Sequence, residues 1–220
     1  MKWIYIIAVT VLFFKMLLSP DLSPEWEGGS IVAAIVTDTG TPNAVSGIIF
    51  RNRLYDTIFE VIVFTIAILG VGFLLAEDRP TETVHKLRDR PSIVLGRLGA
   101  TITALVTIEL AIRGHLSPGG GFAAGVAGGT AIGLIAITTS SQWMEKVYQQ
   151  WNAAVWEKVS VLIFILLAVI ILIGWELPRG ELGSLLSGGT IPLFNILVTI
   201  KVALGSWTII LLFIRYRGLL

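Results

Sequence analysis

The chain has 220 residues, of which 55% are hydrophobic and only 14% are charged, with a formal net charge of +1 and a mean hydropathy of +0.83. Soluble domains carry about a quarter charged residues, so this composition excludes a soluble enzyme domain, and the near-neutral charge argues against nucleic-acid binding. The lack of cysteine excludes disulfides and iron–sulfur ligation in this chain, and two histidines far apart in sequence, His85 and His115, do not indicate a metal site.

Six apolar stretches approach the roughly 20 residues that cross a bilayer as a helix. They are residues 3–18, 55–76, 92–112, 122–139, 159–175 and 193–214. The first has the pattern of a secretory signal but lacks a small-x-small cleavage site, so we interpret it as a membrane anchor. We therefore predict an all-α membrane protein with six transmembrane helices, two plus four, and no soluble domain.

The charged segment 77–91 divides the chain into a two-helix unit, residues 1–76, and a four-helix domain, residues 92–220. Within the first unit, residues 30–36 are too few to span a membrane and predict a re-entrant or surface-lying piece, and residues 43–50 predict a short helix. Nine Lys and Arg residues fall on the side of the termini and four on the opposite side. Because such residues concentrate in cytoplasmic loops, we expect a multi-pass protein of the cell membrane with both termini and the 77–91 linker in the cytoplasm.

A glycine-rich loop joins the third and fourth predicted spans, at Arg113-Gly114-His115-Leu116-Ser117-Pro118-Gly119-Gly120-Gly121-Phe122. Its glycines permit a tight turn with positive φ. Glycines then recur at every fourth position, and this face without side chains allows close approach of another helix. The predicted helix-packing face consists of Gly121, Gly125, Gly129 and Gly133, and we expect a neighbouring subunit to lie against it.

Ionisable side chains inside the spans need a reason to be there, because a charge in the bilayer costs several kcal/mol unless it is paired, hydrated or neutralised. The candidates for an ion path are Asp56, Glu60, Glu109 and Lys201. Glu60, Glu109 and Lys201 are predicted at similar depths, so a hydrated cluster with Lys201 opposite Glu109 is one hypothesis. The alternative is that these groups, and Arg97 near the start of the third span, satisfy partners on other helices or subunits and carry no ions.

His115 in the glycine-rich loop is the fifth candidate for the ion path. An ordinary imidazole has a pKa near 6.5 and exchanges protons at neutral pH. The alternative is structural, with the ring held by a hydrogen bond to a backbone carbonyl of the loop. The glycines also suggest a phosphate-binding loop, but no Lys-Ser or Lys-Thr follows them, so a nucleotide site is not expected.

The stretch from Gly114 to Phe122, followed by Gly125, resembles the signature of the small B subunit of Mrp-type sodium/proton antiporters. The four spans from Ser92 to Arg217 are similar to that subunit in length and layout. Upstream, Asp38-Thr39-Gly40, Asn43-Ala44-Val45, Arg51 and the run from Tyr55 to Glu60 resemble the C-terminal end of the large A subunit. One departure is Ala123-Ala124, where the B-subunit loop commonly continues Gln-Gly, which removes a polar contact at that position.

This resemblance implies a membrane subunit of a multisubunit complex, non-catalytic by itself, that contributes to sodium or proton translocation together with other membrane subunits. It implies that Glu60 occupies the acidic position that the family associates with the ion path. No cofactor is expected in this chain beyond Na⁺ or H⁺ as the transported ion. The fused arrangement favours a membrane-bound hydrogenase or sulfane reductase complex over a plain antiporter. A purely structural scaffold that docks the antiporter-like subunits is the alternative function.

Overall fold

The computed structural model describes residues 10, 14, 28–81, 84 and 87–218. The chain separates into two units, Met1–Ala33 and Ala34–Leu220. The described residues form helices and connecting loops with no strand, and five of these helices are long and apolar enough to cross a membrane. The all-α membrane fold is thus confirmed, whereas the first predicted span, residues 3–18, lies outside the described residues except for residues 10 and 14.

The predicted spans from residue 55 onward correspond to long helices, and the predicted piece at 30–36 falls in a short one. The elements are α2 (Gly28–Thr39), α3 (Ala44–Gly47), the π-helix η1 (Ile48–Asn52), α4 (Leu54–Leu75), α5 (Arg90–Arg113), α6 (Gly120–Thr138), α7 (Ser141–Gln150), α8 (Ala153–Leu172) and α9 (Ile191–Arg217). Two differences from the predicted elements matter below. The helix α7 was not predicted, and α8 begins at Ala153 rather than at residue 159.

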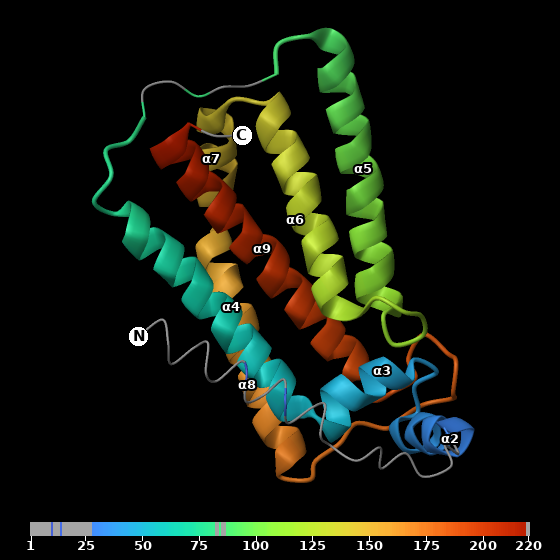
Figure 1. Ribbon diagram of the computed structural model, residues 1–220. Helices are drawn as coiled ribbons and strands as arrows, with labels where there is room; N and C mark the ends of the chain where they lie inside the picture. Colours follow the sequence, from blue (N-terminus) through green and yellow to red (C-terminus); the bar gives the residue numbers. More distant parts are fainter. Residues whose placement is uncertain (1–9, 11–13, 15–27, 82–83, 85–86, 219–220) are drawn as a thin grey trace. The chain divides into compact units, whose positions relative to one another are not determined.

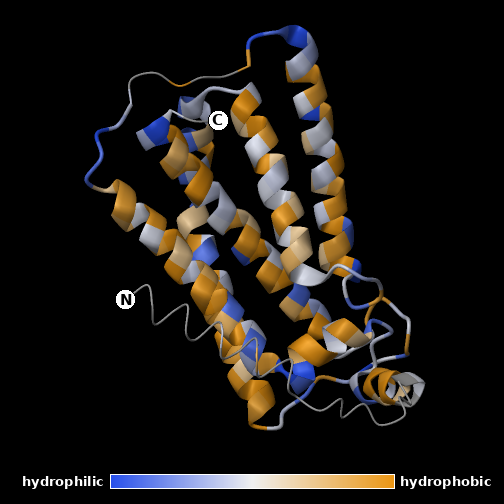
Figure 2. Cartoon of the chain, viewed as in Figure 1, coloured by the Kyte–Doolittle hydropathy of each residue, from blue (hydrophilic) through white to orange (hydrophobic). Residues whose placement is uncertain are grey.

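The longest helix, α9, runs through the middle of the unit formed by residues 34–220 and contacts the other four long helices. In Figure 1 it lies between α4 and α8 on one side and α6 on the other, while α5 packs on α6. Figure 2 shows hydrophobic residues along all five spans and hydrophilic ones gathered mainly at their ends. Across the predicted division at 77–91, α4 packs directly on α9.

Two apolar cores hold this arrangement together. In the first, Phe194 of α9 stacks on Phe50 with ring centroids 5.5 Å apart and contacts Phe164 at 4.9 Å. The second core contains Met144 of α7 and Trp207 of α9. Aromatic pairs of this kind contribute about 0.5–1.5 kcal/mol beyond the area that they bury, so α9 is fixed near both of its ends.

The bundle has two ends, which we call the linker end and the loop end. The linker end carries the described linker residues 76–81, 84 and 87–89 and the C-terminus of α9. There the backbone of the linker bonds to the bundle, since Thr81 N donates to Arg215 O at 2.9 Å and Leu87 N donates to Ile137 O at 3.1 Å. The loop end carries the connection between α5 and α6, where Gly119 and Gly120 have φ of 135° and 67°. These angles favour glycine, as the sequence predicts.

Candidate functional site

A buried ion pair lies in the interior of the bundle, between Lys201 of α9 and Glu157 of α8. Lys201 is 1% exposed and Glu157 is 6% exposed, and Lys201 Nζ donates a hydrogen bond to Glu157 Oε1. Burying either charge alone costs several kcal/mol, and a close partner offsets that cost. The pair therefore explains how a lysine is accommodated ten residues into a membrane-spanning helix.

A third helix, α4, completes the surroundings of Lys201. The ring of Phe64 lies beneath the ammonium, with Nζ 5.4 Å from the ring centroid. Such a cation–π contact adds about 2 kcal/mol when the cation is desolvated. Gly205, one turn along α9, permits the approach, because a Cβ there would lie 2.8 Å from Phe64 Cε1. The ammonium is thus held by one carboxylate and one aromatic face from two different helices.

The ionisable residues predicted to form one cluster do not do so. Lys201 pairs with Glu157, and Glu109 instead pairs with Arg113, one turn further along α5, at 3.2 Å with both side chains more than half exposed. The hypothesis of Lys201 opposite Glu109 is therefore wrong. Glu60 is exposed on α4, and Asp56 is half-exposed beside Arg53.

These exposed charges belong to helices whose outer faces no other described residue of the unit 34–220 covers. Arg97 on α5 is exposed in the same way. Within the described part of the chain, no hydrogen bond or ion pair engages the Glu60 carboxylate. A carboxylate on a spanning helix is not stable against lipid, so Glu60 marks a face that needs a neighbour or water in the membrane.

The glycine-rich loop is anchored from two sides by asparagine side chains. Asn43 Nδ2 donates to Gly114 O at 2.7 Å and to Ser117 O at 2.8 Å, while its Oδ1 caps α3 by accepting from the backbone N of Val45 and Ser46. On the other side, Asn195 Oδ1 of α9 accepts from Gly121 N at 2.8 Å. The asparagine upstream of α4 thus joins the N-terminal part of the unit to the motif that follows α5.

His115 is fully buried in this loop, at 0% exposure. Its two ring nitrogens have no hydrogen-bond partner among the described residues, although backbone groups of Ser184, Leu185 and Ile112 lie near the ring. Burial is the main influence and lowers the pKa of His115 below its usual value, against the smaller opposing effect of these backbone groups. The ring is therefore neutral at physiological pH, and the role of His115 in the ion path stays a prediction.

The glycine face of α6 packs on α9 of the same chain. A Cβ built on Gly121 would lie 2.4 Å from Asn195 O, one on Gly125 would lie 2.4 Å from Val202 Cβ, and one on Gly129 would lie 2.7 Å from Ser206 Cβ. Thr199 Oγ1 also donates to Gly121 O at 3.1 Å. The close neighbour expected from another subunit is thus an internal helix, and this face is not available for docking a partner.

A network of ion pairs closes the loop end. Arg51 donates from Nε to Asp38 at 3.0 Å and from Nη1 to Glu176 at 2.8 Å, and Arg179 lies 3.6 Å from both carboxylates. The hydrogen bond from Arg51 is the main cause that lowers the pKa of Glu176. This network ties the segment before α4 to the loop between α8 and α9.

Glu157 and Asn195 were missed in the sequence. Glu157 follows Trp156 and precedes Lys158, which is typical of a membrane boundary, so the fifth span was placed after it. The signal that points to it is Lys201, since a lysine inside a span requires a carboxylate partner. Asn195 lies near the start of a predicted span, where a polar residue needs no special explanation.

Comparison with known families and structures agrees with this architecture. Residues 91–208 match a family described as a domain related to the MnhB subunit of Na⁺/H⁺ antiporter. A similar solved structure is a chain of the membrane-bound sulfane sulfur reductase (MBS), an archaeal respiratory membrane complex, with a TM-score of 0.72, 23% identity, and coverage of 97% of each chain. No curated protein sequence matches the chain.

Proposed function

The chain belongs to the family of domains related to the MnhB subunit of Na⁺/H⁺ antiporters, and from this premise we propose that it is a membrane subunit that contributes to sodium or proton translocation in a multisubunit respiratory complex. The observation that carries the proposal is the buried Lys201–Glu157 pair. Both residues lie within the matched range, inside membrane-spanning helices, where charged side chains are costly and usually mark functional sites. The resemblance of residues 1–76 to an antiporter A subunit extends the same proposal to the segment around Glu60.

The chemistry of the pair suits ion movement. An ammonium and a carboxylate attract each other strongly in a low-dielectric interior, so a further charge that arrives beside them perturbs the pair. A cation that approached Glu157 would weaken its hold on Lys201, and a proton that bound Glu157 would remove the pairing charge altogether. The pair is therefore a two-state element inside the membrane whose state depends on the ion nearby.

The exposed charged residues support the assembly part of the proposal. Glu60 and Arg97 lie on helix faces that are exposed within the described part of the unit 34–220, and such groups need protein or water around them in a membrane. We place other membrane subunits against these faces of α4 and α5. Electron transfer and sulfur or hydrogen chemistry belong to other subunits, and the chain acts as a non-catalytic component.

The host complex we favour is an energy-converting one of the sulfane reductase or membrane-bound hydrogenase type. The support is that the fold similarity to a chain of the sulfane sulfur reductase extends over 97% of both chains. A plain Mrp antiporter is the alternative. Gene neighbours encoding nickel–iron or iron–sulfur subunits favour the first, and their replacement by a full antiporter set favours the second.

The central experiment measures sodium-dependent proton movement in vesicles that contain the assembled complex. Three variants are compared: Glu60→Gln, the neutral double substitution Glu157→Gln with Lys201→Met, and, as a surface control, Glu181→Gln in the exposed loop between α8 and α9. The double substitution removes both charges together and leaves no unpaired buried ion. We expect normal assembly in all three, loss of transport in the first two and no loss in the control.

The scaffold alternative predicts a different result from the same variants. If the chain only holds other subunits together, both charge-removing variants keep normal transport as long as the complex assembles. That outcome would falsify the translocation role and leave the assembly role. Replacing sodium by potassium in the wild-type assay identifies the coupling ion, since a proton-only path is indifferent to the exchange.

The proposed orientation has its own test, because the natural chain has no cysteine. Single cysteines at Glu77 on the linker end and at Ser117 on the loop end are treated with a membrane-impermeant maleimide in intact cells. With both termini in the cytoplasm, Ser117→Cys is labelled and Glu77→Cys is labelled only after permeabilisation. The reverse pattern overturns the orientation.

A further inference from the structure

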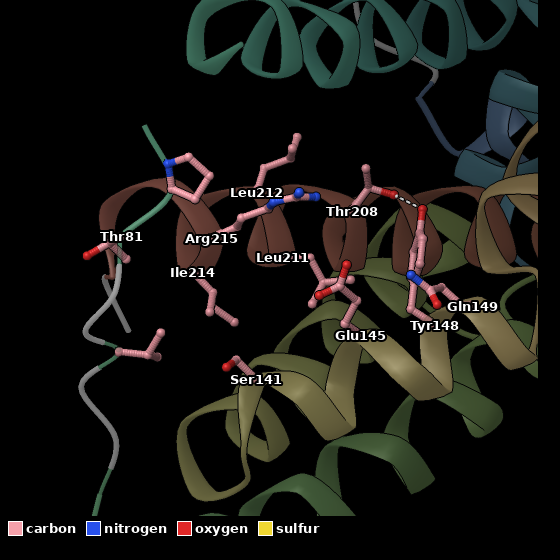
Figure 3. Close-up of a pocket in the computed structure, with 12 residues that line it drawn as sticks. Thr81, Ser141, Glu145, Tyr148, Gln149, Thr208, Leu211, Leu212, Ile214 and Arg215 are labelled. Atoms are coloured by element: carbon pink, nitrogen blue, oxygen red, sulfur yellow. Dashed lines mark hydrogen bonds between the residues drawn. The ribbon is translucent and has the colours of Figure 1, made fainter. Parts of the chain in front are cut away.

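A cavity opens at the linker end of the bundle, between α9, α7 and the linker. Its volume is about 320 Å³. Figure 3 shows its lining, in which Thr81 lies near one end and the pair of Tyr148 and Thr208 at the other. Glu145 and Arg215 also line it, so the walls offer groups that hydrate readily.

The inner boundary of the cavity is a hydrogen bond between two hydroxyl groups. Tyr148 Oη and Thr208 Oγ1 are 2.8 Å apart, and both residues are partly buried. Among the residues of α9 that line the cavity, Thr208 is the one nearest in sequence to Lys201. The hydroxyl pair is therefore the part of the lining on α9 that lies nearest along the helix to the buried ion pair.

Polar residues recur at intervals of seven along α9, at Lys201, Thr208 and Arg215. Seven residues are close to two helical turns, so the three lie on one face, about 10.5 Å apart along the axis. Facing them, the chain segment α7–α8 supplies Glu157 opposite Lys201, Tyr148 opposite Thr208, and Glu145 in the wall that also contains Arg215. We call these six residues the polar seam.

Two further observations connect the outer and inner parts of the polar seam. Burial is the main cause that raises the pKa of Tyr148, and the charge of Glu157 raises it further, so the phenol and the carboxylate interact electrostatically. The ring of Trp207 packs edge-on against Tyr148 at 5.3 Å, and its buried Nε1 has no hydrogen-bond partner among the described residues. This ring contact fixes the position of the Tyr148 phenol against α9.

We propose that the cavity is an aqueous inlet, and that the Tyr148–Thr208 hydrogen bond is the gate through which protons pass between the linker end and the Lys201–Glu157 pair. This inference rests on the proposed translocation function and specifies the side from which the pair is reached. The occupant is water, because the cavity is large enough to hold it and its mixed lining includes hydroxyl, carboxylate and guanidinium groups that can hydrogen-bond to it. The remaining rise of about 10.5 Å from Thr208 to Lys201 is bridged by water when the gate opens.

The proton balance of this step is simple. A hydronium ion in the cavity gives up one proton, the two hydroxyl groups each donate one and accept one, and an O–H bond forms on Glu157. The pair then carries one net positive charge. It returns to neutrality when Lys201 releases a proton onward or when Glu157 returns its proton to the cavity. No oxidant or reductant takes part.

The test uses single cysteines in the assembled complex, since the chain contains none of its own. Thr208→Cys is compared with Ile209→Cys, its immediate neighbour at the same depth, which does not line the cavity. A small, charged thiosulfonate reagent reacts with thiols that contact water. We expect Thr208→Cys to react at least tenfold faster than Ile209→Cys, and only when the reagent is supplied at the linker end. Equal rates, or protection of both positions, overturn the inlet.

The gate is tested separately with Tyr148→Phe and Thr208→Val, which remove the hydroxyls at nearly constant volume. We expect at least a tenfold fall in proton flux with unchanged assembly, and Thr130→Val, whose hydroxyl bonds only within its own helix, serves as the matched control. Full flux in both hydroxyl variants overturns the gate. If Thr208→Cys is accessible while the Glu157→Gln/Lys201→Met variant transports normally, the inlet stands and the proposed function fails. If that variant is inactive while Thr208→Cys is protected, the proposed function stands and the inlet fails.

Discussion

The contact between α6 and α9 gives a prediction whose size follows from the geometry. A Cβ on Gly125 would lie 2.4 Å from Val202 Cβ, whereas one on Gly133 would lie 3.6 Å from Ile210 Cδ1. Carbon atoms in contact prefer roughly 3.5–4.0 Å. Gly125→Ala therefore requires the two helices to move apart by about 1 Å at this point, whereas Gly133→Ala requires no movement.

The expected difference in stability comes from the steric term alone. Overpacking a well-packed interior costs about 1–3 kcal/mol. The gain from replacing glycine with alanine inside a helix, about 1 kcal/mol, applies to both variants and cancels in the comparison. We expect Gly125→Ala to be less stable than Gly133→Ala by about 1–3 kcal/mol, with a change of about 2–4 °C in Tm for each kcal/mol in a chain of this length.

The assay is thermal unfolding of the detergent-solubilised complex, followed by size-exclusion chromatography with a fluorescent tag on this subunit. Both variants are first checked for equal incorporation at low temperature. The reasoning is refuted if Gly125→Ala melts at or above the temperature of Gly133→Ala. Gly129→Ala, with its 2.7 Å approach to Ser206 Cβ, should fall between the two.

Three further predictions concern the loop end. Arg51→Met should lose about 1.5–3 kcal/mol of stability, because it removes charged hydrogen bonds from a side chain only 26% exposed. The control Arg53→Met, in an exposed pair, should lose under about 1 kcal/mol. Equal melting temperatures of the two variants would contradict this difference. Asn43→Ala should lose about 1–2 kcal/mol of stability, because it removes the N-cap of α3. Proteolysis of the glycine-rich loop should become faster, and an unchanged rate would contradict the prediction. His115 has a lowered pKa in the folded state, so as the pH drops the unfolded chain binds the proton first, and stability falls below a pH of about 6.5. Between pH 7.5 and 5.5 the melting temperature should fall less for His115→Asn than for the natural chain. An equal fall in both would contradict this role of His115.

The sequence predicts the spans well because hydropathy is a local property. Each of the four helices α4, α5, α6 and α9 begins and ends within three residues of the predicted stretch. The start of α8 was misplaced by six residues because Glu157 is polar, and its depth depends on α7 packing beside it. Burial of that carboxylate depends on tertiary packing, and the local sequence at 156–158 does not indicate it.

The pairing of charges could not be predicted for a related reason. Helices that are apolar all round give no periodicity to show which face meets which neighbour. The sequence predicts Lys201 and Glu109 at similar depths, yet Lys201 faces α8 and α4, whereas Glu109 lies on an exposed face of α5. Depth along a helix follows from the rise per residue, whereas azimuth in such helices follows only from packing.

One face of α9 packs on α6 and another carries Lys201, and because the two faces are adjacent, a change in packing also affects the ion pair. Val202 receives the tightest contact with α6 and is adjacent in sequence to Lys201, which faces α8 and α4. A displacement of the backbone at Val202 therefore moves the ammonium relative to Glu157 and the Phe64 ring. For this reason Gly125→Ala should reduce proton flux even at temperatures where the complex remains assembled, whereas Gly133→Ala, two helical turns away from that contact, should not. The glycine face thus acts on function from inside the chain, by holding Lys201 at the position where its partners can reach it.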